Sequence, residues 1–282
     1  MQPMDLRQWL KQAEKQLAAA GVVTARLDMI VLLEDVTGIG RALLLAEPGM
    51  KLSAAQSAKL KKLLSRRAAH EPLAYIRGKT EFYGRDFVIT PNVLEPRPES
   101  EAMIDVFKDL SKGGPFGQKG PNNGLRPRIA DVGAGSGALG ITAALEVPNN
   151  SVDLLEIDSK VLKVAKTNVD KFTLNIDTVK SDLLEQSAKD YDILLCNLPY
   201  VPDDYHINQA AGHEPRLAIF GGPDGLDVYR RLFRQISDLP RQPLYILSEA
   251  LPLQHAVLQA IARQQGYRLA KTNDFIQLFT KP

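Results

Sequence analysis

A four-residue segment in the second half of the chain carries groups that could orient a nitrogen nucleophile. Asn197, Leu198, Pro199 and Tyr200 directly follow an apolar run at 191–196, which predicts a buried strand that ends at this point. The carboxamide oxygen of an asparagine can accept one N–H group, and a neighbouring backbone carbonyl can accept a second. The tyrosine ring offers a flat wall for a planar group. The segment therefore indicates a site that holds an amino or amide nitrogen as a methyl acceptor.

A glycine-rich turn lies upstream, between a predicted strand at 128–132 and a predicted helix at 138–146. Alternating glycines permit a tight turn and a close approach of the backbone to a ligand, and the helix N-terminus adds exposed N–H donors. The next predicted strand ends in acidic residues, and a carboxylate at such a place can accept both hydroxyls of a ribose. The sequence predicts a nucleoside site made by Asp131, Gly133, Ala134, Gly135, Ser136, Gly137, Glu156 and Ile157.

The same turn is compatible with other roles. It fits the Gly-x-Gly-x-x-Gly/Ala fingerprint of dinucleotide sites, so the turn alone does not distinguish a nicotinamide cofactor from another nucleoside ligand. A structural turn without a ligand is a third alternative, and the three alternating glycines argue against it. Residues 197–200 favour a methyltransferase, because hydride transfer has no evident need for paired hydrogen-bond acceptors at that strand end.

Bulk composition restricts the class of protein. The chain has 282 residues, enough for roughly two domains, and its hydrophobic content of 44% is ordinary for a soluble globular protein. A formal net charge of +2 gives no strong electrostatic attraction for nucleic acid, so a protein or small-molecule substrate is expected. The single cysteine, Cys196, excludes an internal disulfide, and the four histidines lie in no metal-ligand spacing. We expect no metal.

Targeting signals are absent from the sequence pattern. No charged-then-apolar leader occurs at the N-terminus, and no apolar run reaches the ~18 residues that a membrane span needs. These observations predict a cytoplasmic enzyme with no membrane segment.

The N-terminal part of the chain has a helical pattern. Apolar residues recur at helical spacing up to about residue 67, glycines and prolines divide this part into short helices, and Ser53 is a candidate N-cap. A hairpin follows over 81–89, with its turn predicted at Gly84 and Arg85. The predicted domains are a helical, substrate-recognising domain at 1–75, a hairpin linker at 76–95 and a catalytic domain at 96–282.

Predicted strands and helices alternate from residue 128 onward, which is typical of a doubly wound α/β sheet. A flexible loop is predicted before this part, over 111–127. The two last segments, 267–269 and 275–279, predict a closing antiparallel pair. Strands are predicted at 128–132, 152–157, 177–180, 191–196 and 243–248, and helices at 138–146, 159–171, 225–236 and 252–265.

Segments spread over nearly the whole chain resemble one enzyme family, the release-factor glutamine methyltransferases (PrmC/HemK). The most specific are Pro-Arg-Pro-Glu-Ser-Glu at 96–101, with Ser100 for the family's Thr, and Glu-Pro-Arg-Leu-Ala at 214–218 followed by Gly-Gly-Pro-Asp-Gly-Leu-Asp at 221–227. Further matches lie at 25–28, 71–76 and 81–84. The resemblance implies a Rossmann-like class I methyltransferase fold, mostly parallel with an antiparallel C-terminal strand, behind a small helical domain.

The resemblance also implies a reaction. The family transfers a methyl group from S-adenosylmethionine to the side-chain nitrogen of the Gln in the Gly-Gly-Gln motif of peptide-chain release factors. By this resemblance the Asn197 oxygen and the Leu198 carbonyl hold the substrate amide, Pro199 fixes the bend and Tyr200 packs on the amide. Further implied cofactor contacts are Ser181, Asp182, Leu183 and Asn197.

Some roles stay open at this point. Asp131 either binds the methionyl amine through water or caps the glycine turn. Arg97 and Glu99 either border the substrate site or form a loop-stabilising ion pair. Leu198 stands where the family usually has Pro, and Glu95 where an aliphatic residue is common. Asn-Leu-Pro-Tyr also occurs in ribosomal-RNA adenine methyltransferases, which are therefore the alternative class, although the near-neutral charge and the two specific segments argue against it.

Overall fold

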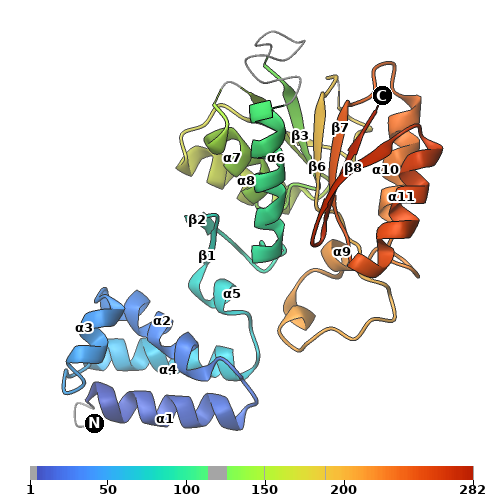
Figure 1. Ribbon diagram of the computed structural model, residues 1–282. Coiled ribbons are helices and arrows are strands. Elements are labelled where there is room, and N and C mark those ends of the chain that lie inside the picture. The colour runs from blue at the N-terminus through green and yellow to red at the C-terminus, as the bar shows by residue number, and fades with distance from the viewer. Residues whose placement is uncertain (1–4, 114–125, 149, 188, 282) are drawn as a thin grey trace. The chain divides into compact units, whose positions relative to one another are not determined.

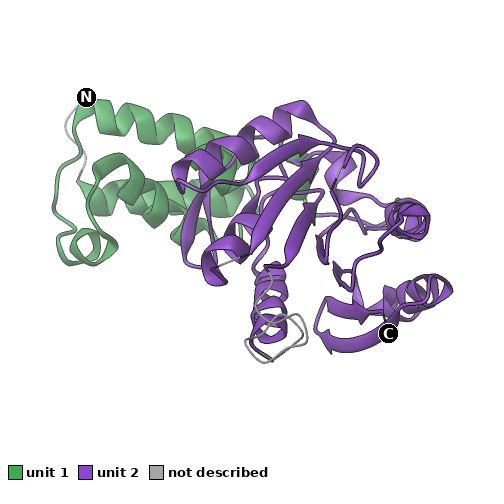
Figure 2. Ribbon diagram, turned by 90° about the horizontal axis from the view of Figure 1, so that it is seen from above, with its two compact units in different colours: residues 1–78, 208–213 green, residues 79–207, 214–282 purple. Residues whose placement is uncertain are grey.

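The computed structural model describes residues 5–113, 126–148, 150–187 and 189–281. The chain divides into two compact units, residues 1–78 with 208–213 and residues 79–207 with 214–282, coloured separately in Figure 2. Compactness alone does not show which parts fold independently, so the domain boundaries drawn from the sequence stay a prediction. Most of the loop predicted at 111–127 lies outside the described residues, whereas Ser111 belongs to a helix and not to that loop.

The first unit is built from short helices, as the pattern of apolar residues predicts. Its core contains Leu6, Trp9, Leu17, Met29 and Leu60. Ser53 accepts a hydrogen bond from the Gln56 N–H and the Gln56 side chain bonds back, so the predicted N-cap is confirmed as a full capping box. The helices are α1 (Leu6–Ala19), α2 (Ala25–Thr37), α3 (Arg41–Ala46), α4 (Ala54–Ala68) and α5 (Leu73–Arg77).

A buried ion pair joins two of these helices. Asp28 of α2 is 4% exposed, and its Oδ2 accepts hydrogen bonds from Arg67 Nε of α4 at 2.6 Å and from the Thr24 hydroxyl at 2.9 Å. The Asp28 carboxylate is thereby compensated within the core of the helical unit. Removal of either partner would leave an uncompensated buried charge.

The second unit contains a seven-stranded sheet in the order β5-β4-β3-β6-β7-β9-β8. The pairs among β3 to β7 are parallel, and β9 pairs antiparallel with both of its neighbours. The predicted fold class is therefore confirmed, including the antiparallel closing pair. The strands are β3 (Arg128–Val132), β4 (Ser151–Glu156), β5 (Asp177–Lys180), β6 (Ile193–Cys196), β7 (Tyr245–Glu249), β8 (Arg268–Asn273) and β9 (Ile276–Thr280).

Helices cover both faces of this sheet (Figure 1). On one face, β-strand side chains such as Leu195 and Leu247 pack with residues of α6 (Glu101–Gly113), α7 (Ala138–Glu146) and α8 (Ser159–Lys171). On the other face, Leu194 and Ile246 pack with residues of α10 (Asp227–Asp238) and α11 (His255–Gln264). Because alternate strand residues enter opposite cores, the strands between are buried on both sides.

The predicted hairpin forms from β1 (Lys79–Phe82) and β2 (Arg85–Val88). Its turn was placed one residue too late, because Phe82 pairs with Arg85 and leaves Tyr83 and Gly84 as the turn residues. Phe87 packs on Phe82 and on Phe172, the C-cap residue of α8. The hairpin is thus part of the core of the second unit.

Helix starts deviate from the sequence prediction near two loops. The helix predicted from residue 225 begins at Asp227, and the one predicted from residue 252 begins as a 3₁₀ turn, Pro252–Gln254, before α11. A 3₁₀ turn, Pro98–Ser100 (η1), likewise precedes α6. Within the described ranges no helix is long and apolar enough to cross a membrane.

Replacement of Arg67 by Ala is expected to destabilise the helical unit by about 3–5 kcal/mol, because it strands the buried Asp28 charge. The control is Arg41→Ala, which breaks the exposed pair with Glu34 and should cost below about 1 kcal/mol. Urea unfolding followed by circular dichroism measures both. Equal losses in the two variants would contradict the role of the buried pair.

Candidate active site

The predicted site residues meet at the carboxyl ends of the parallel strands, around a cavity of about 220 Å³. The ends of β3, β4, β5 and β6 all contribute, which is where ligands bind in open α/β sheets. Four predicted site residues do not line the cavity: Gly137, Tyr200, Arg97 and Glu99. The lining includes Asp131, Gly133, Ala134, Gly135, Ser136, Glu156, Ile157, Ser181, Asp182, Leu183, Asn197, Leu198 and Pro199.

The glycine turn is tightly constrained by its neighbours. Gly133 and Gly137 both have positive φ values, of 71° and 80°. A Cβ on Gly133 would lie 2.9 Å from Leu198 Cδ2, and one on Gly137 would lie 2.9 Å from Leu154 Cδ1. Gly133 therefore allows the Leu198 side chain to cover the turn, whereas Gly137 allows close packing of α7 on β4.

Glu156 is held in place by backbone donors at the end of β4. Its Oε2 accepts from the Gly135 N–H and its Oε1 from the Asp158 N–H, each at 3.0 Å. Burial raises the pKa of Glu156 above its ordinary value, and these N–H donors oppose that rise. The carboxyl group is therefore fixed at the cavity wall before any ligand arrives.

Asp131 at the end of β3 is almost fully buried, at 1% exposure. Its Oδ2 accepts from the Gly140 N–H at 2.8 Å, so it ties the strand to the first turn of α7. Burial raises the pKa of Asp131 to about 7, against the effect of that hydrogen bond. This hydrogen bond supports the capping role for Asp131. Because Asp131 also lines the cavity, its alternative role, binding of the methionyl amine through water, stays a prediction.

Asn197 and Tyr200 each form a hydrogen bond with a polar side chain. Asn197 Nδ2 donates to Ser100 Oγ at 2.8 Å, and the Tyr200 hydroxyl donates to Glu249 Oε1 at 3.0 Å. Leu198 between them is 2% exposed. With its nitrogen engaged by Ser100, the Asn197 carboxamide has its oxygen available as an acceptor.

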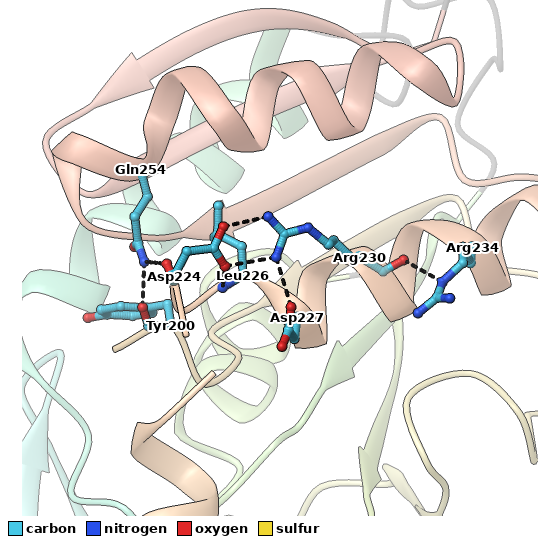
Figure 3. A network of polar contacts seen from close by, with 7 residues as sticks. All are labelled: Tyr200, Asp224, Leu226, Asp227, Arg230, Arg234 and Gln254. Atoms are coloured by element: carbon cyan, nitrogen blue, oxygen red, sulfur yellow. Dashed lines mark hydrogen bonds and ion pairs between the residues drawn. The ribbon is translucent and has the colours of Figure 1, made fainter. Parts of the chain in front are cut away.

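The loop at 221–225 approaches the main chain of segment 197–200 closely. A Cβ on Gly221 would lie 2.4 Å from the Pro199 carbonyl oxygen, and one on Gly225 would lie 2.0 Å from the Tyr200 carbonyl oxygen. Gln254 Nε2 donates to the carbonyls of Tyr200 and Asp224, both at 2.7 Å (Figure 3). Segment 197–200 is therefore positioned through its main chain.

An ion pair between Arg230 of α10 and Asp224 joins the 221–225 loop to that helix. Arg230 donates to Asp224 and, at 2.8 Å, to Asp227, while the Leu226 N–H donates to Asp224 (Figure 3). The Arg230 guanidinium lowers the pKa of Asp224 to about 2. These contacts fix the loop that carries the glycines.

Arg97 forms an ion pair and does not line the cavity. Its guanidinium donates to Glu214 Oε2 at 2.6 Å and lies 3.9 Å from Glu95 Oε2, and the Thr80 hydroxyl donates to Glu95 Oε1 at 3.0 Å. Burial raises the pKa of Glu214 to about 7, although Arg97 opposes the rise. The cluster joins the 96–101 and 214–218 segments. Glu95, unexplained by the sequence, is one of its members.

Sequence reasoning missed three buried polar residues of the site: Ser100, Glu249 and Gln254. Glu249 directly follows an apolar strand, the same signal that identified Asp131 and Glu156, and it could have been found in that way. Gln254 and Ser100 lie in short 3₁₀ turns and give no such signal. Across the described ranges, no group of three or more His, Cys, Asp or Glu residues is placed to hold a metal ion.

The sheet order, the glycine turn and the strand-end carboxylates define a class I methyltransferase fold. The catalytic domain of hMettl16 in complex with MAT2A 3'UTR hairpin 6 has a similar fold, with a TM-score of 0.53 and 16% identity over 83% of this chain and 84% of that one. The family models for the PrmC N-terminal domain and the Methyltransferase small domain match residues 8–78 and 119–214.

Similar relatives are named release factor glutamine methyltransferase. That of Koribacter versatilis is 34% identical, covering 83% of this chain and 81% of the relative. That of Coxiella burnetii is 31% identical, covering 94% and 92%, and that of Bacillus subtilis is 32% identical, covering 85% and 83%. The chain belongs to the release factor glutamine methyltransferase family and is an enzyme, as the family resemblance predicts.

Replacement of Asp131 by Asn should change how stability depends on pH. The folded-state pKa of Asp131, about 7, lies above its ordinary value, so the native state binds a proton that the unfolded state releases. Wild-type unfolding free energy should therefore fall, relative to the variant, as pH rises from about 4 to about 7. Urea unfolding across this range measures it. Parallel curves for the two proteins would refute the raised pKa.

Replacement of Gly225 by Ala should displace segment 197–200 and reduce methyl transfer at least tenfold, in the range expected for a misplaced reacting group. The new Cβ would occupy space 2.0 Å from the Tyr200 carbonyl oxygen. Gly266→Ala is the matched control, because Gly266 has a similar φ of 81° and its nearest neighbour would be 3.8 Å away. Activity of both variants is compared by initial rates. Full activity in Gly225→Ala would show that the close approach is not needed.

Proposed function

We propose that this enzyme transfers a methyl group from S-adenosylmethionine to the side-chain nitrogen of the Gln in the Gly-Gly-Gln motif of peptide-chain release factors. The names of its relatives support release factors and glutamine as the substrate. The observation that carries the proposal is the pose of Asn197, whose amide nitrogen is held by Ser100 while the residue lines the cavity. A carboxamide oxygen in that place suits an N–H donor on the substrate.

The cavity has features that suit the cofactor. Gly135 has a positive φ value and carries no side chain, so a ligand can approach the main chain there. Glu156 provides a fixed carboxyl group for the ribose hydroxyls, and Ser181, Asp182 and Leu183 line the wall expected to face the adenine. S-adenosylmethionine, when bound, supplies an electrophilic methyl group on a positively charged sulfur.

An amide nitrogen is a poor nucleophile, because its lone pair is delocalised into the carbonyl group. In the proposed mechanism, the Asn197 side-chain oxygen and the Leu198 backbone carbonyl accept the two N–H groups of the substrate amide. This aims the nitrogen and favours the pyramidal geometry that frees the lone pair. Positioning of this kind contributes on the order of 7–11 kcal/mol in well-oriented reactions.

The same acceptors stabilise the positive charge that develops on nitrogen, since their dipoles are fixed in advance. Pro199 keeps the segment bent. Tyr200 does not line the cavity, so its packing on the substrate amide rests on the family resemblance alone. No strong base is required before methyl transfer, because the nitrogen loses its proton afterwards. In this scheme, residues 197–200 act by position and by dipole.

Asn197→Ala should reduce methyl transfer to a release factor by roughly 10²-fold or more, because one preorganised acceptor is lost. Transfer of labelled methyl groups measures the rate, and mass spectrometry locates the modified residue. Asn150→Ala is the control, since it removes a carboxamide bonded to the Ala143 carbonyl, away from the cavity lining. Binding of S-adenosylhomocysteine checks that the site is intact.

Undiminished transfer by a folded Asn197→Ala variant would exclude the acceptor role. Ribosomal RNA is assayed in parallel with the release factor. Methylation of RNA adenine, with none on the release-factor Gln, would overturn the proposed substrate in favour of the alternative class.

A further inference from the structure

Glu249 is a buried carboxyl group that the mechanism above does not use. It ends β7, and its strand neighbour Ser248 is paired with Cys196, so Glu249 and Asn197 lie side by side at the same edge of the sheet. Glu249 is 1% exposed. Its Oε1 accepts from the Tyr200 hydroxyl, and its Oε2 is buried without a hydrogen-bond partner. An unpaired buried carboxyl oxygen beside a catalytic segment calls for a function.

Ser100 connects Glu249 to Asn197. The Ser100 hydroxyl is buried and accepts a hydrogen bond from Asn197 Nδ2 at 2.8 Å. The hydroxyl's own proton is not used in that bond. Glu249 Oε2 is the unpaired buried acceptor toward which that proton can rotate, and Ser100 favours the charged form of Glu249. A serine hydroxyl has a single proton to donate. Once that proton points to Glu249, Ser100 can only accept from Asn197.

This restriction decides which end of the Asn197 carboxamide faces the cavity. The oxygen and nitrogen ends of a carboxamide are nearly the same size, so packing alone does not distinguish them. A Ser100 hydroxyl that only accepts selects the nitrogen, which leaves the oxygen for the substrate. If its proton were free, Ser100 could donate to the Asn197 oxygen, and the amide would present two N–H groups to the N–H groups of the substrate.

We infer that Glu249, acting through the Ser100 hydroxyl, is a positioning residue that keeps the Asn197 carboxamide oxygen directed to the substrate nitrogen. The inference rests on the proposed function in that this oxygen is the acceptor. Glu249 also holds the Tyr200 hydroxyl. One carboxylate thus orients two residues of the substrate-binding segment.

Protonation of Glu249 should reverse the arrangement. A protonated carboxyl group donates to Ser100, which frees the serine proton for the Asn197 oxygen. Burial raises the pKa of Glu249, Glu99 on η1 raises it further by repulsion, and Ser100, Tyr200 and Asn197 oppose the rise. Tyr229 of α10 contacts the Glu249 main chain. The acid limb of activity should therefore lie above the ordinary pH range of a glutamate.

Glu249→Gln tests the inference, because Gln mimics the protonated group. Its oxygen can accept from Tyr200, and its amide nitrogen must then donate towards Ser100. At neutral pH the variant should lose at least tenfold in kcat, as for a lost preorganised dipole, and should lack the acid limb. Binding of S-adenosylhomocysteine should stay unchanged, so the loss appears in kcat and not in cofactor affinity.

Variants at Ser100 separate the relay from a general packing effect. Ser100→Thr keeps the hydroxyl and should retain activity within about twofold, whereas Ser100→Ala should lose most of it. Ser111→Ala is the matched control, because it removes a hydroxyl of α6 that donates to the Phe107 carbonyl. It should behave as wild type. Ser100→Ala with wild-type kcat would overturn the inference.

A readout that needs no catalysis is the nuclear magnetic resonance of the Asn197 side-chain amide in the wild-type protein. Its ¹H and ¹⁵N shifts should titrate together with the Glu249 carboxyl carbon, and they should stay constant in Glu249→Gln. An Asn197 amide that ignores Glu249 titration would overturn the relay even if a variant failed to fold. A wild-type enzyme that does not methylate release factors would instead reject the proposed function, and this titration would still test the relay.

Discussion

The site depends on a close approach between two main chains. The carbonyl oxygens of Pro199 and Tyr200 lie where Cβ atoms of Gly221 and Gly225 would otherwise be, so only glycine fits at these two positions. Gln254 adds hydrogen bonds that tie Tyr200 to Asp224. These contacts act on the backbone, so the main-chain conformation of segment 197–200 does not depend on the side chain at position 198.

This constraint explains why Leu198 can stand where the family usually has Pro. The leucine side chain is buried, and it covers the glycine turn close to Gly133. It therefore contributes packing between segment 197–200 and the glycine turn. The direction of the Leu198 carbonyl is set by Pro199 and by the 221–225 loop, and not by the Leu198 side chain.

The carboxyl edge of the sheet concentrates buried acids. Glu156 and Glu249 are the last residues of β4 and β7, and Asp131 is the penultimate residue of β3. Burial raises the pKa of each. Asp131 and Glu156 accept backbone N–H groups and serve turn geometry. Glu249 accepts a side-chain hydroxyl instead. The difference in partners separates the two acids that bond to the main chain around the glycine turn from Glu249, the one proposed to orient Asn197 and Tyr200.

Sequence periodicity predicted regular elements well where local signals agree. The strands at 128–132 and 177–180 and the helices at 138–146 and 159–171 match the structure residue for residue. The helix predicted from residue 225 starts later, because Gly225 has a φ of 79° and is committed to its approach to Tyr200. Tertiary contact overrode local propensity there, and a single sequence carries no sign of such a contact.

The two segments that identify the family contact each other through some residues and line the cavity with others. Arg97 and Glu214, one from each of the two most specific segments, bond to each other, and Glu95 completes their charge cluster. Pro96 and Ser100 of the first segment and Pro215 and Ala218 of the second line the cavity, as does Glu95. The ion pair thus joins two walls of one cavity. Because each segment combines an ion-pairing residue with cavity-lining neighbours, a motif match identifies the enzyme class more readily than the role of each residue.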